Sequence, residues 1–256
     1  MVTSDATKEN LPLISPKTLA RIAGLSYLLM SVPFVFAVQV RSRLVEAGDA
    51  AATVENIRAS ATLFRIAFVA DLVSGAWFLL TALALYQLLK HVHPLAAVAM
   101  TAFVAVSTAV GYLNTLNQFS ALTIATSPQY TQAFGRAGSN ALAMMFADIQ
   151  SNGLTIQELF WGMWLFPLGY LVIKSGYFPR RLGALLLVAG FSWVAQFFAD
   201  FLMPAAPYFA SFLGIGELIF AAWLVVKGVN VPASGASAPP VSRQIPMLFV
   251  NSTLPR

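Results

Sequence analysis

Apolar residues dominate the chain in long runs, and polar residues fall mainly between those runs. Six runs are long enough for helices that cross a bilayer, which takes roughly 20 largely apolar residues. They cover residues 19–40, 63–89, 95–124, 155–173, 182–203 and 208–226. The pattern predicts an all-α integral membrane protein with six transmembrane helices. The second and third runs are long enough to tilt or to continue beyond the bilayer as helix.

The segments that flank these runs set the domain boundaries. Residues 1–18 form a hydrophilic N-terminal segment, and residues 19–228 form the predicted membrane domain. After Gly228 the composition shifts to Pro, Ser, Ala and Gly, which cannot bury enough apolar surface to order itself. Residues 229–256 are therefore predicted to be a disordered tail.

Lysine and arginine positions predict the orientation, because cytoplasmic loops carry an excess of both. With both termini inside, ten basic residues fall on the inner side: Lys8, Lys17, Arg21, Lys90, Lys174, Arg180, Arg181, Lys227, Arg243 and Arg256. Five fall outside: Arg41, Arg43, Arg58, Arg65 and Arg136. We therefore expect a multi-pass protein of the bacterial cytoplasmic (inner) membrane with both termini in the cytoplasm.

Two outer connections are long enough to hold structure. In the first, Asp49 can cap a short surface helix that carries Val54 and Ile57 on one face. The second, residues 127–153, contains the apolar stretch 141–146 just before Asp148. This stretch is too short to span a bilayer, so it predicts an interfacial or re-entrant helix.

The composition agrees with a lipid environment. Hydrophobic residues make up 58% of the chain and charged residues 10%, which excludes an ordinary water-soluble domain. The chain has no cysteine, so disulfides, thiolate nucleophiles and zinc-thiolate or iron–sulfur sites are excluded. Its net charge of +5 is spread over helix ends and loops, which indicates contact with anionic lipid rather than nucleic acid. The bilayer is the predicted partner, no cofactor is predicted, and the oligomeric state stays open.

The even-numbered runs share an internal repeat of acid, Leu, two residues, Gly or Ala, one residue, and Trp. The three copies begin at Asp71, Glu158 and Glu217. The odd-numbered runs each carry a glutamine in the outer portion, so the pattern predicts three in-out-in helical hairpins. It also places the three acids at similar depth around one cavity, with the tryptophans facing elsewhere. The alternative is that acids and tryptophans simply favour membrane interfaces.

Polar side chains inside the spans are the candidate site. An ionised group within a span costs roughly 2.5 to 3.5 kcal/mol on insertion scales, and it normally faces a partner or a wet cavity. We expect an outward-facing acidic vestibule that binds or transports a small cationic or proton-coupled solute. Arg65 is expected to pair with an acid of a neighbouring span. The predicted ligand-binding residues are Asp71, Glu158, Asp200, Glu217, Gln118, Asn114, Gln196 and Arg65.

Other functions stay open. The catalytic and nucleotide-binding motifs HExxH, Gly-x-Ser-x-Gly, the phosphate-binding loop and the dinucleotide fingerprint do not occur, so no catalytic residue is predicted. His91 and His93 lack a nearby third ligand, so no metal site is predicted either. An enzyme that uses paired carboxylates on a lipid or envelope precursor is one alternative. A sensor or assembly partner is another.

Three segments carry a family resemblance. They are residues 41–57, with Arg41-Ser42-Arg43-Leu44 and the stretch after Gly48, residues 169–183, and residues 216–228. These segments resemble a bacterial multi-pass membrane family that is catalogued as domain-of-unknown-function family 4386. The resemblance covers most of the chain and implies an integral-membrane fold. It implies no established activity, so it assigns no residue a role.

Overall fold

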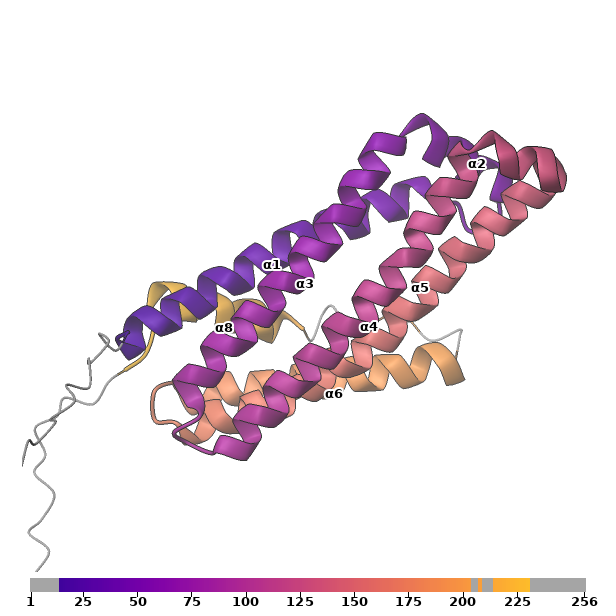
Figure 1. The fold of residues 1–256 in the computed structure, drawn as a ribbon. Helices are drawn as coiled ribbons and strands as arrows, with labels where there is room; N and C mark the ends of the chain where they lie inside the picture. Colours follow the sequence, from indigo (N-terminus) through magenta and orange to yellow (C-terminus); the bar gives the residue numbers. More distant parts are fainter. Residues whose placement is uncertain (1–13, 204–206, 209–213, 231–256) are drawn as a thin grey trace, which may run out of the picture.

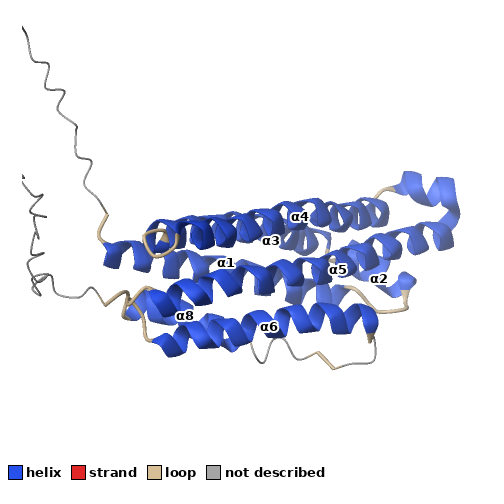
Figure 2. Cartoon of the chain, turned by 90° about the horizontal axis from the view of Figure 1, so that it is seen from below, coloured by secondary structure: helices blue, strands red, loops and turns tan. Residues whose placement is uncertain are grey.

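The computed structural model describes residues 14–203, 207–208 and 214–230, and all of its regular structure there is α-helix (Figures 1 and 2). In chain order the helices are α1 (Pro16–Leu44), α2 (Ala50–Ala59), α3 (Ala61–Leu89), α4 (Pro94–Thr126), α5 (Pro128–Lys174), α6 (Arg180–Leu202) and α8 (Ile215–Val226). The predicted all-α class is confirmed.

Five helices are long and apolar enough to cross a membrane: α1, α3, α4, α5 and α6. They contain the first five predicted runs. Helix α8 corresponds to the sixth run but has only 12 residues, and residues 209–213 of that run lie outside the described part. The membrane-helix character of the chain is confirmed, whereas the number of six spans is not.

Two of the long helices, α1 and α4, begin at a side chain that caps a free N–H group. Ser15 precedes α1, and its Oγ accepts a hydrogen bond from the Thr18 N–H at 3.1 Å. His93 precedes α4, and its Nδ1 accepts from the Ala96 N–H at 3.1 Å. Helices α3 and α4 have 29 and 33 residues. Both are about 44 to 50 Å long, which exceeds the roughly 30 Å hydrocarbon core, as their sequence runs predict.

Six helices form a closed ring in which each packs against its two neighbours. The order round the ring is α1, α3, α4, α5, α6 and α8, and α8 returns to α1. Helix α2 lies across one end, where it contacts α5 and α4 (Figure 1). The three predicted hairpins are neighbouring pairs in this ring. The helices of these pairs differ in length, with 33 and 47 residues in α4 and α5 and 23 and 12 in α6 and α8.

The helix predicted at the membrane interface, residues 141–149, is instead part of α5. A break at Gly135 (φ 69°, ψ 169°) turns the chain after the first residues of α5, and that conformation suits glycine. Beyond the break the helix continues to Lys174. Ala143 and Ala147 are buried within the bundle, whereas Met145 and Ile149 are exposed.

Helix α2 is confirmed as predicted. Asp49 Oδ1 accepts a hydrogen bond from the Ala52 N–H at 2.9 Å, which caps the helix. Val54 and Ile57 are buried on its inner face.

Two apolar clusters fill the two ends of the ring. The α2-end cluster consists of Ala37, Val40, Leu44, Val54, Ile57, Phe64, Ala67, Leu122, Ile124, Ala125 and Ala143. The far-end cluster is larger, and its fully buried side chains include Leu85, Leu89, Met100, Leu165, Leu168, Leu171, Leu186 and Phe220. Along α3, α4 and α5, the residues between the two clusters include polar side chains, such as Asp71, Asn114 and Gln157.

Both chain ends of the described domain lie at the far end. A Cβ added at Gly228 would lie 3.2 Å from Lys17 Cγ, and the Asn230 N–H donates to the Tyr177 carbonyl at 3.0 Å. This proximity agrees with termini on one side of a membrane, but which side stays a prediction. Most of the predicted N-terminal segment and tail, residues 1–13 and 231–256, lies outside the described residues.

Candidate functional site

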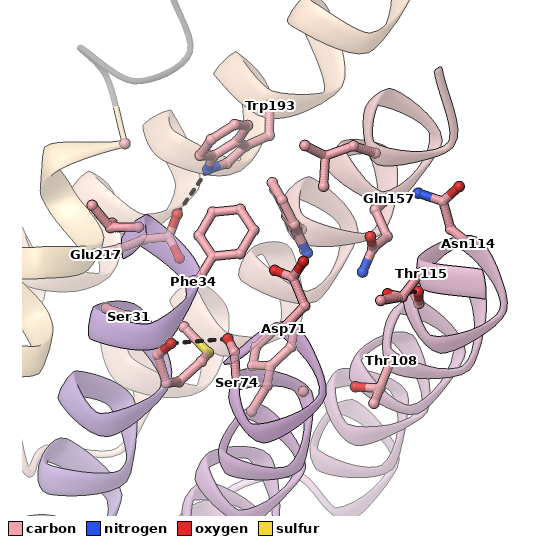
Figure 3. A pocket seen from close by; sticks show the side chains of 18 of the residues that line it. Ser31, Phe34, Asp71, Ser74, Thr108, Asn114, Thr115, Gln157, Trp193 and Glu217 are labelled. Atoms are coloured by element: carbon pink, nitrogen blue, oxygen red, sulfur yellow. Dashed lines mark hydrogen bonds between the residues drawn. The ribbon is translucent and has the colours of Figure 1, made fainter. Parts of the chain in front are cut away.

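A cavity of about 570 Å³ lies between the two apolar clusters (Figure 3). All six ring helices contribute to its wall. Its polar lining residues are Ser31, Arg41, Asp71, Ser74, Thr108, Asn114, Thr115, Gln150, Gln157 and Glu217. Its aromatic lining residues are Tyr27, Phe34, Phe78, Tyr112, Trp161, Trp164 and Trp193.

A buried ion pair holds Asp71 at the side of the cavity nearer α2. Arg41 Nη1 donates to Asp71 Oδ2, and the two side chains are 9% and 13% exposed. The same nitrogen also donates to Gln118 Oε1 at 3.1 Å. Gln118 in turn donates from Nε2 to the Phe64 carbonyl at 3.2 Å, which fixes its orientation. The Asp71 charge is therefore neutralised within the protein.

One nitrogen of the Arg41 guanidinium takes no part in these hydrogen bonds. Its Nη2 is buried and has no hydrogen-bond partner among the described residues, and Arg41 lines the cavity. A buried donor of this kind costs free energy unless a partner satisfies it. The Arg41–Asp71 pair therefore leaves one buried donor unsatisfied among the described residues.

Glu217 is held differently, by two neutral donors. The Tyr27 hydroxyl donates to Oε2, and Trp193 Nε1 donates to Oε1 at 2.7 Å (Figure 3). Within the described part of the chain, Glu217 makes no ion pair. Both donors orient the carboxylate, but neither supplies a positive charge.

Aromatic rings stand beside Glu217. The Phe34 and Trp161 ring centroids are 5.2 Å apart, and those of Trp161 and Trp193 are 5.4 Å apart, both nearly perpendicular. Trp193 is also the indole that donates to Glu217. Aromatic faces attract cations, more strongly where water is excluded. The carboxylate and the rings together suit a positively charged group.

Helices α4 and α5 are joined along the cavity by reciprocal amide contacts. Asn114 Nδ2 of α4 donates to the Gln150 carbonyl at 2.8 Å, and Gln157 Nε2 of α5 donates to the Ser107 carbonyl at 3.1 Å. Each amide lies against a glycine of the other helix. A Cβ at Gly153 would be 2.1 Å from Asn114 Oδ1, and one at Gly111 would be 2.2 Å from Gln157 Nε2.

The remaining predicted acids lie outside the cavity wall, on α5 and α6. The Tyr208 hydroxyl donates to Glu158 Oε1 at 3.0 Å, while Glu158 Oε2 is buried and has no partner in the described part of the chain. Gln196 Nε2 donates to Asp200 Oδ1 at 2.7 Å. The structure thus divides the predicted set. Asp71, Glu217 and Asn114 line the cavity, Gln118 supports it, and Glu158, Asp200 and Gln196 lie elsewhere.

The expected Arg65 pairing is wrong. Arg65 is exposed on α3, and the described residues include no ion pair between it and Glu158, Asp200 or Glu217. Its neighbours Phe64 and Ala67 are the residues of that turn that face inward. Arg41 takes the expected role, and sequence reasoning missed it because the first run was ended at Val40. In the structure α1 continues to Leu44 and buries Arg41.

The repeated motif serves packing as well as the cavity. A Cβ at Gly162 would lie 2.7 Å from the Gly190 carbonyl oxygen of α6, and one at Gly75 would lie 2.5 Å from the Tyr112 ring. The expectation that the tryptophans face elsewhere is wrong for Trp164, which is 1% exposed and lines the cavity. The acids of two copies share the cavity, and the third, Glu158, does not line it.

The expected opening toward the outer face is also not found at the end covered by α2. Along α3, α4 and α5, the α2-end cluster lies between the cavity-lining residues and α2. The far-end cluster closes the opposite side in the same way.

Comparison with known proteins agrees with this architecture. The family model described as "Domain of unknown function (DUF4386)" matches residues 22–228. The chain belongs to this family. An uncharacterized protein of Archaeoglobus fulgidus is 40% identical over 75 residues, which are 29% of this chain and 46% of that relative. The chain thus matches less than half of the relative's length. No solved structure gives a significant match.

Proposed function

We propose that this membrane protein binds a small solute with a cationic group in the cavity, with Glu217 as the anionic partner. One observation carries the proposal. The cavity contains two carboxylates and one guanidinium, and Arg41 is already paired with Asp71. Glu217 is therefore a buried carboxylate that is oriented by neutral donors and supplied with no positive charge among the described residues.

Physical arguments favour a cation as the missing partner. Charges interact more strongly in the protein interior than in water, so a cation near Glu217 gains both Coulomb energy and contact with the aromatic faces. An anion would meet the Glu217 charge and would find Arg41 occupied by Asp71.

The packing on both sides of the cavity supports binding or alternating access more than a channel. The described residues form apolar clusters at both ends of the ring, so they leave no polar path from end to end. The alternative of a carboxylate-pair enzyme has less support, because Arg41 holds one of the two carboxylates that face the cavity. Whether the protein moves its solute across the bilayer stays a prediction.

The test compares choline with 3,3-dimethylbutanol, its neutral isostere, on purified protein in lipid nanodiscs. We expect choline to bind at least tenfold more tightly by calorimetry and to raise the unfolding temperature. Glu217→Gln should abolish the difference between the two probes. Asp148→Asn is the matched control, because Asp148 is an exposed carboxylate of α5 that does not line the cavity. Equal binding of both probes to the unmodified protein would contradict the proposal.

A further inference from the structure

The cavity has a lateral mouth. Among the described residues that line it, three are strongly exposed: Val35 (54%), Ile215 (58%) and Leu218 (54%). The other lining residues are buried or half-buried. All three exposed residues are apolar, and they come from α1 and α8. The cavity therefore opens sideways between these two helices.

The lengths of α1 and α8 explain this opening. The two helices are in close contact near the far end, where a Cβ at Gly24 would lie 2.7 Å from Leu224 Cβ and 2.9 Å from the Val225 nitrogen. Helix α8 has 12 residues and α1 has 29, which correspond to about 18 and 44 Å. Helix α8 begins at Ile215, so it follows only part of α1 and leaves Val35 uncovered.

The rim of the mouth is suited to lipid tails. Val32 and Phe36 of α1 and Ile219 of α8 are exposed apolar residues beside it. Val35 lies inside a helix that qualifies as a membrane span, nine residues or about 13 Å before the last residue of α1. A mouth at this position faces the apolar part of a bilayer rather than water.

Glu217 lies just inside the mouth. It is the residue between Ile215 and Leu218 on α8 that lines the cavity, and Trp193 donates to it there (Figure 3). Tyr27 donates to its other oxygen. A molecule that reaches Glu217 from the bilayer would therefore keep its trailing part between Val35 and Leu218. A charged head at the carboxylate and an apolar chain at the rim match these two environments.

We infer that the ligand is a membrane-dissolved amphiphile, with one cationic head group and an apolar chain, which enters between α1 and α8. The inference rests on the proposed function, because it takes Glu217 as the site of the cationic head. It adds the chemical class of the ligand and its route of entry.

The test uses the mouth variant Val35→Trp and the probes choline and decyltrimethylammonium in nanodiscs. The indole ring introduced at position 35 should obstruct the path of the alkyl chain without reaching the head-group site. We expect Val35→Trp to weaken decyltrimethylammonium binding at least tenfold and choline binding less than threefold. Val69→Trp is the matched control, since Val69 is 53% exposed on α3 and does not line the cavity.

The outcomes separate the two proposals. If Val35→Trp and Val69→Trp bind both probes equally, while choline binding still depends on Glu217, the lateral route is wrong and the cation site stands. If neither probe depends on Glu217, the proposed function fails and the inference fails with it. Circular dichroism and gel filtration of both tryptophan variants show whether each remains folded.

Discussion

Asp71 and Glu217 occupy equivalent places in two copies of one sequence motif and line the same cavity, yet their carboxylates have different kinds of partner. Asp71 is held by Arg41, with Gln118 as a further partner of that guanidinium. Glu217 is held by a phenol and an indole. The first carboxylate is neutralised inside the protein, and the second is only oriented.

This difference separates a structural role from a binding role. A buried ion pair becomes costly when one partner is removed, because the survivor stays charged and buried. A carboxylate that is held only by neutral donors is already a buried charge without an opposite charge. Neutralising it therefore removes an unfavourable desolvation free energy instead of adding one. We therefore expect the two acids to respond in opposite ways to loss of charge or partner.

The largest effect is expected from Arg41→Ala, which leaves Asp71 without its cation. Loss of one member of a buried pair typically destabilises a protein by about 3 to 5 kcal/mol. The measurement is reversible unfolding in mixed micelles. Arg65→Ala is the control, because Arg65 is exposed on the neighbouring helix, and it should change stability little. Adding Asp71→Asn to Arg41→Ala should restore part of the loss. Equal losses of stability in Arg41→Ala and Arg65→Ala would show that the Arg41–Asp71 pair contributes no more to stability than an exposed arginine does.

Tyr27→Phe should have the next largest effect and probes the other carboxylate. Tyr27 is 2% exposed, and its hydroxyl donates to Glu217. A hydrogen bond to a charged group contributes about 1.5 to 3 kcal/mol, so the variant should lose stability in that range. In the Glu217→Gln background the same change should cost less, because the acceptor is neutral. A double mutant cycle with no coupling would show that the hydroxyl acts on something other than Glu217.

Gly162→Ala tests whether the repeated motif packs helices as well as placing acids. The added Cβ would lie 2.6 Å from Val194 Cγ2 and 2.7 Å from the Gly190 carbonyl oxygen, so α5 and α6 must separate. Overpacking of this kind typically costs about 1 to 3 kcal/mol. Gly138→Ala, at an exposed position of α5 that lies clear of other helices, should instead leave stability unchanged or raise it. Equal unfolding temperatures for the two variants would argue against the packing role.

The fold was predictable where the signal was local. Asp49 with Val54 and Ile57 predicted α2, and the first five apolar runs located five helices, because capping and apolar periodicity depend on adjacent residues. The part of α5 before residue 155 was not predicted as a continuation of the spanning helix. Its polar residues, such as Gln150, interrupt the apolar pattern but are buried against α4. Such partners come from another helix and leave no local signal.

The two acids that line the cavity could be predicted from the sequence, but the residues that bind their carboxylates could not. The motif singled out Asp71 and Glu217, because ionisable residues are rare inside spans and mark functional positions. The partners Arg41, Tyr27 and Trp193 carry no comparable signal, since arginine near a helix end and aromatic residues in a span are ordinary features. Which acid pairs with which residue depends on the order of helices round the ring, and that order is a tertiary property.

The smallest effect on stability, and the sharpest on binding, is expected from Glu217→Gln. The amide keeps an oxygen that can accept from Tyr27 or Trp193, and it removes a buried charge that no cation offsets among the described residues. The free energy of unfolding should therefore change by less than about 1 kcal/mol, in contrast to the loss expected for Arg41→Ala. Binding of a cationic probe should fall at least tenfold in the same variant. A loss of stability as large as that of Arg41→Ala would contradict the expected difference between the two carboxylates.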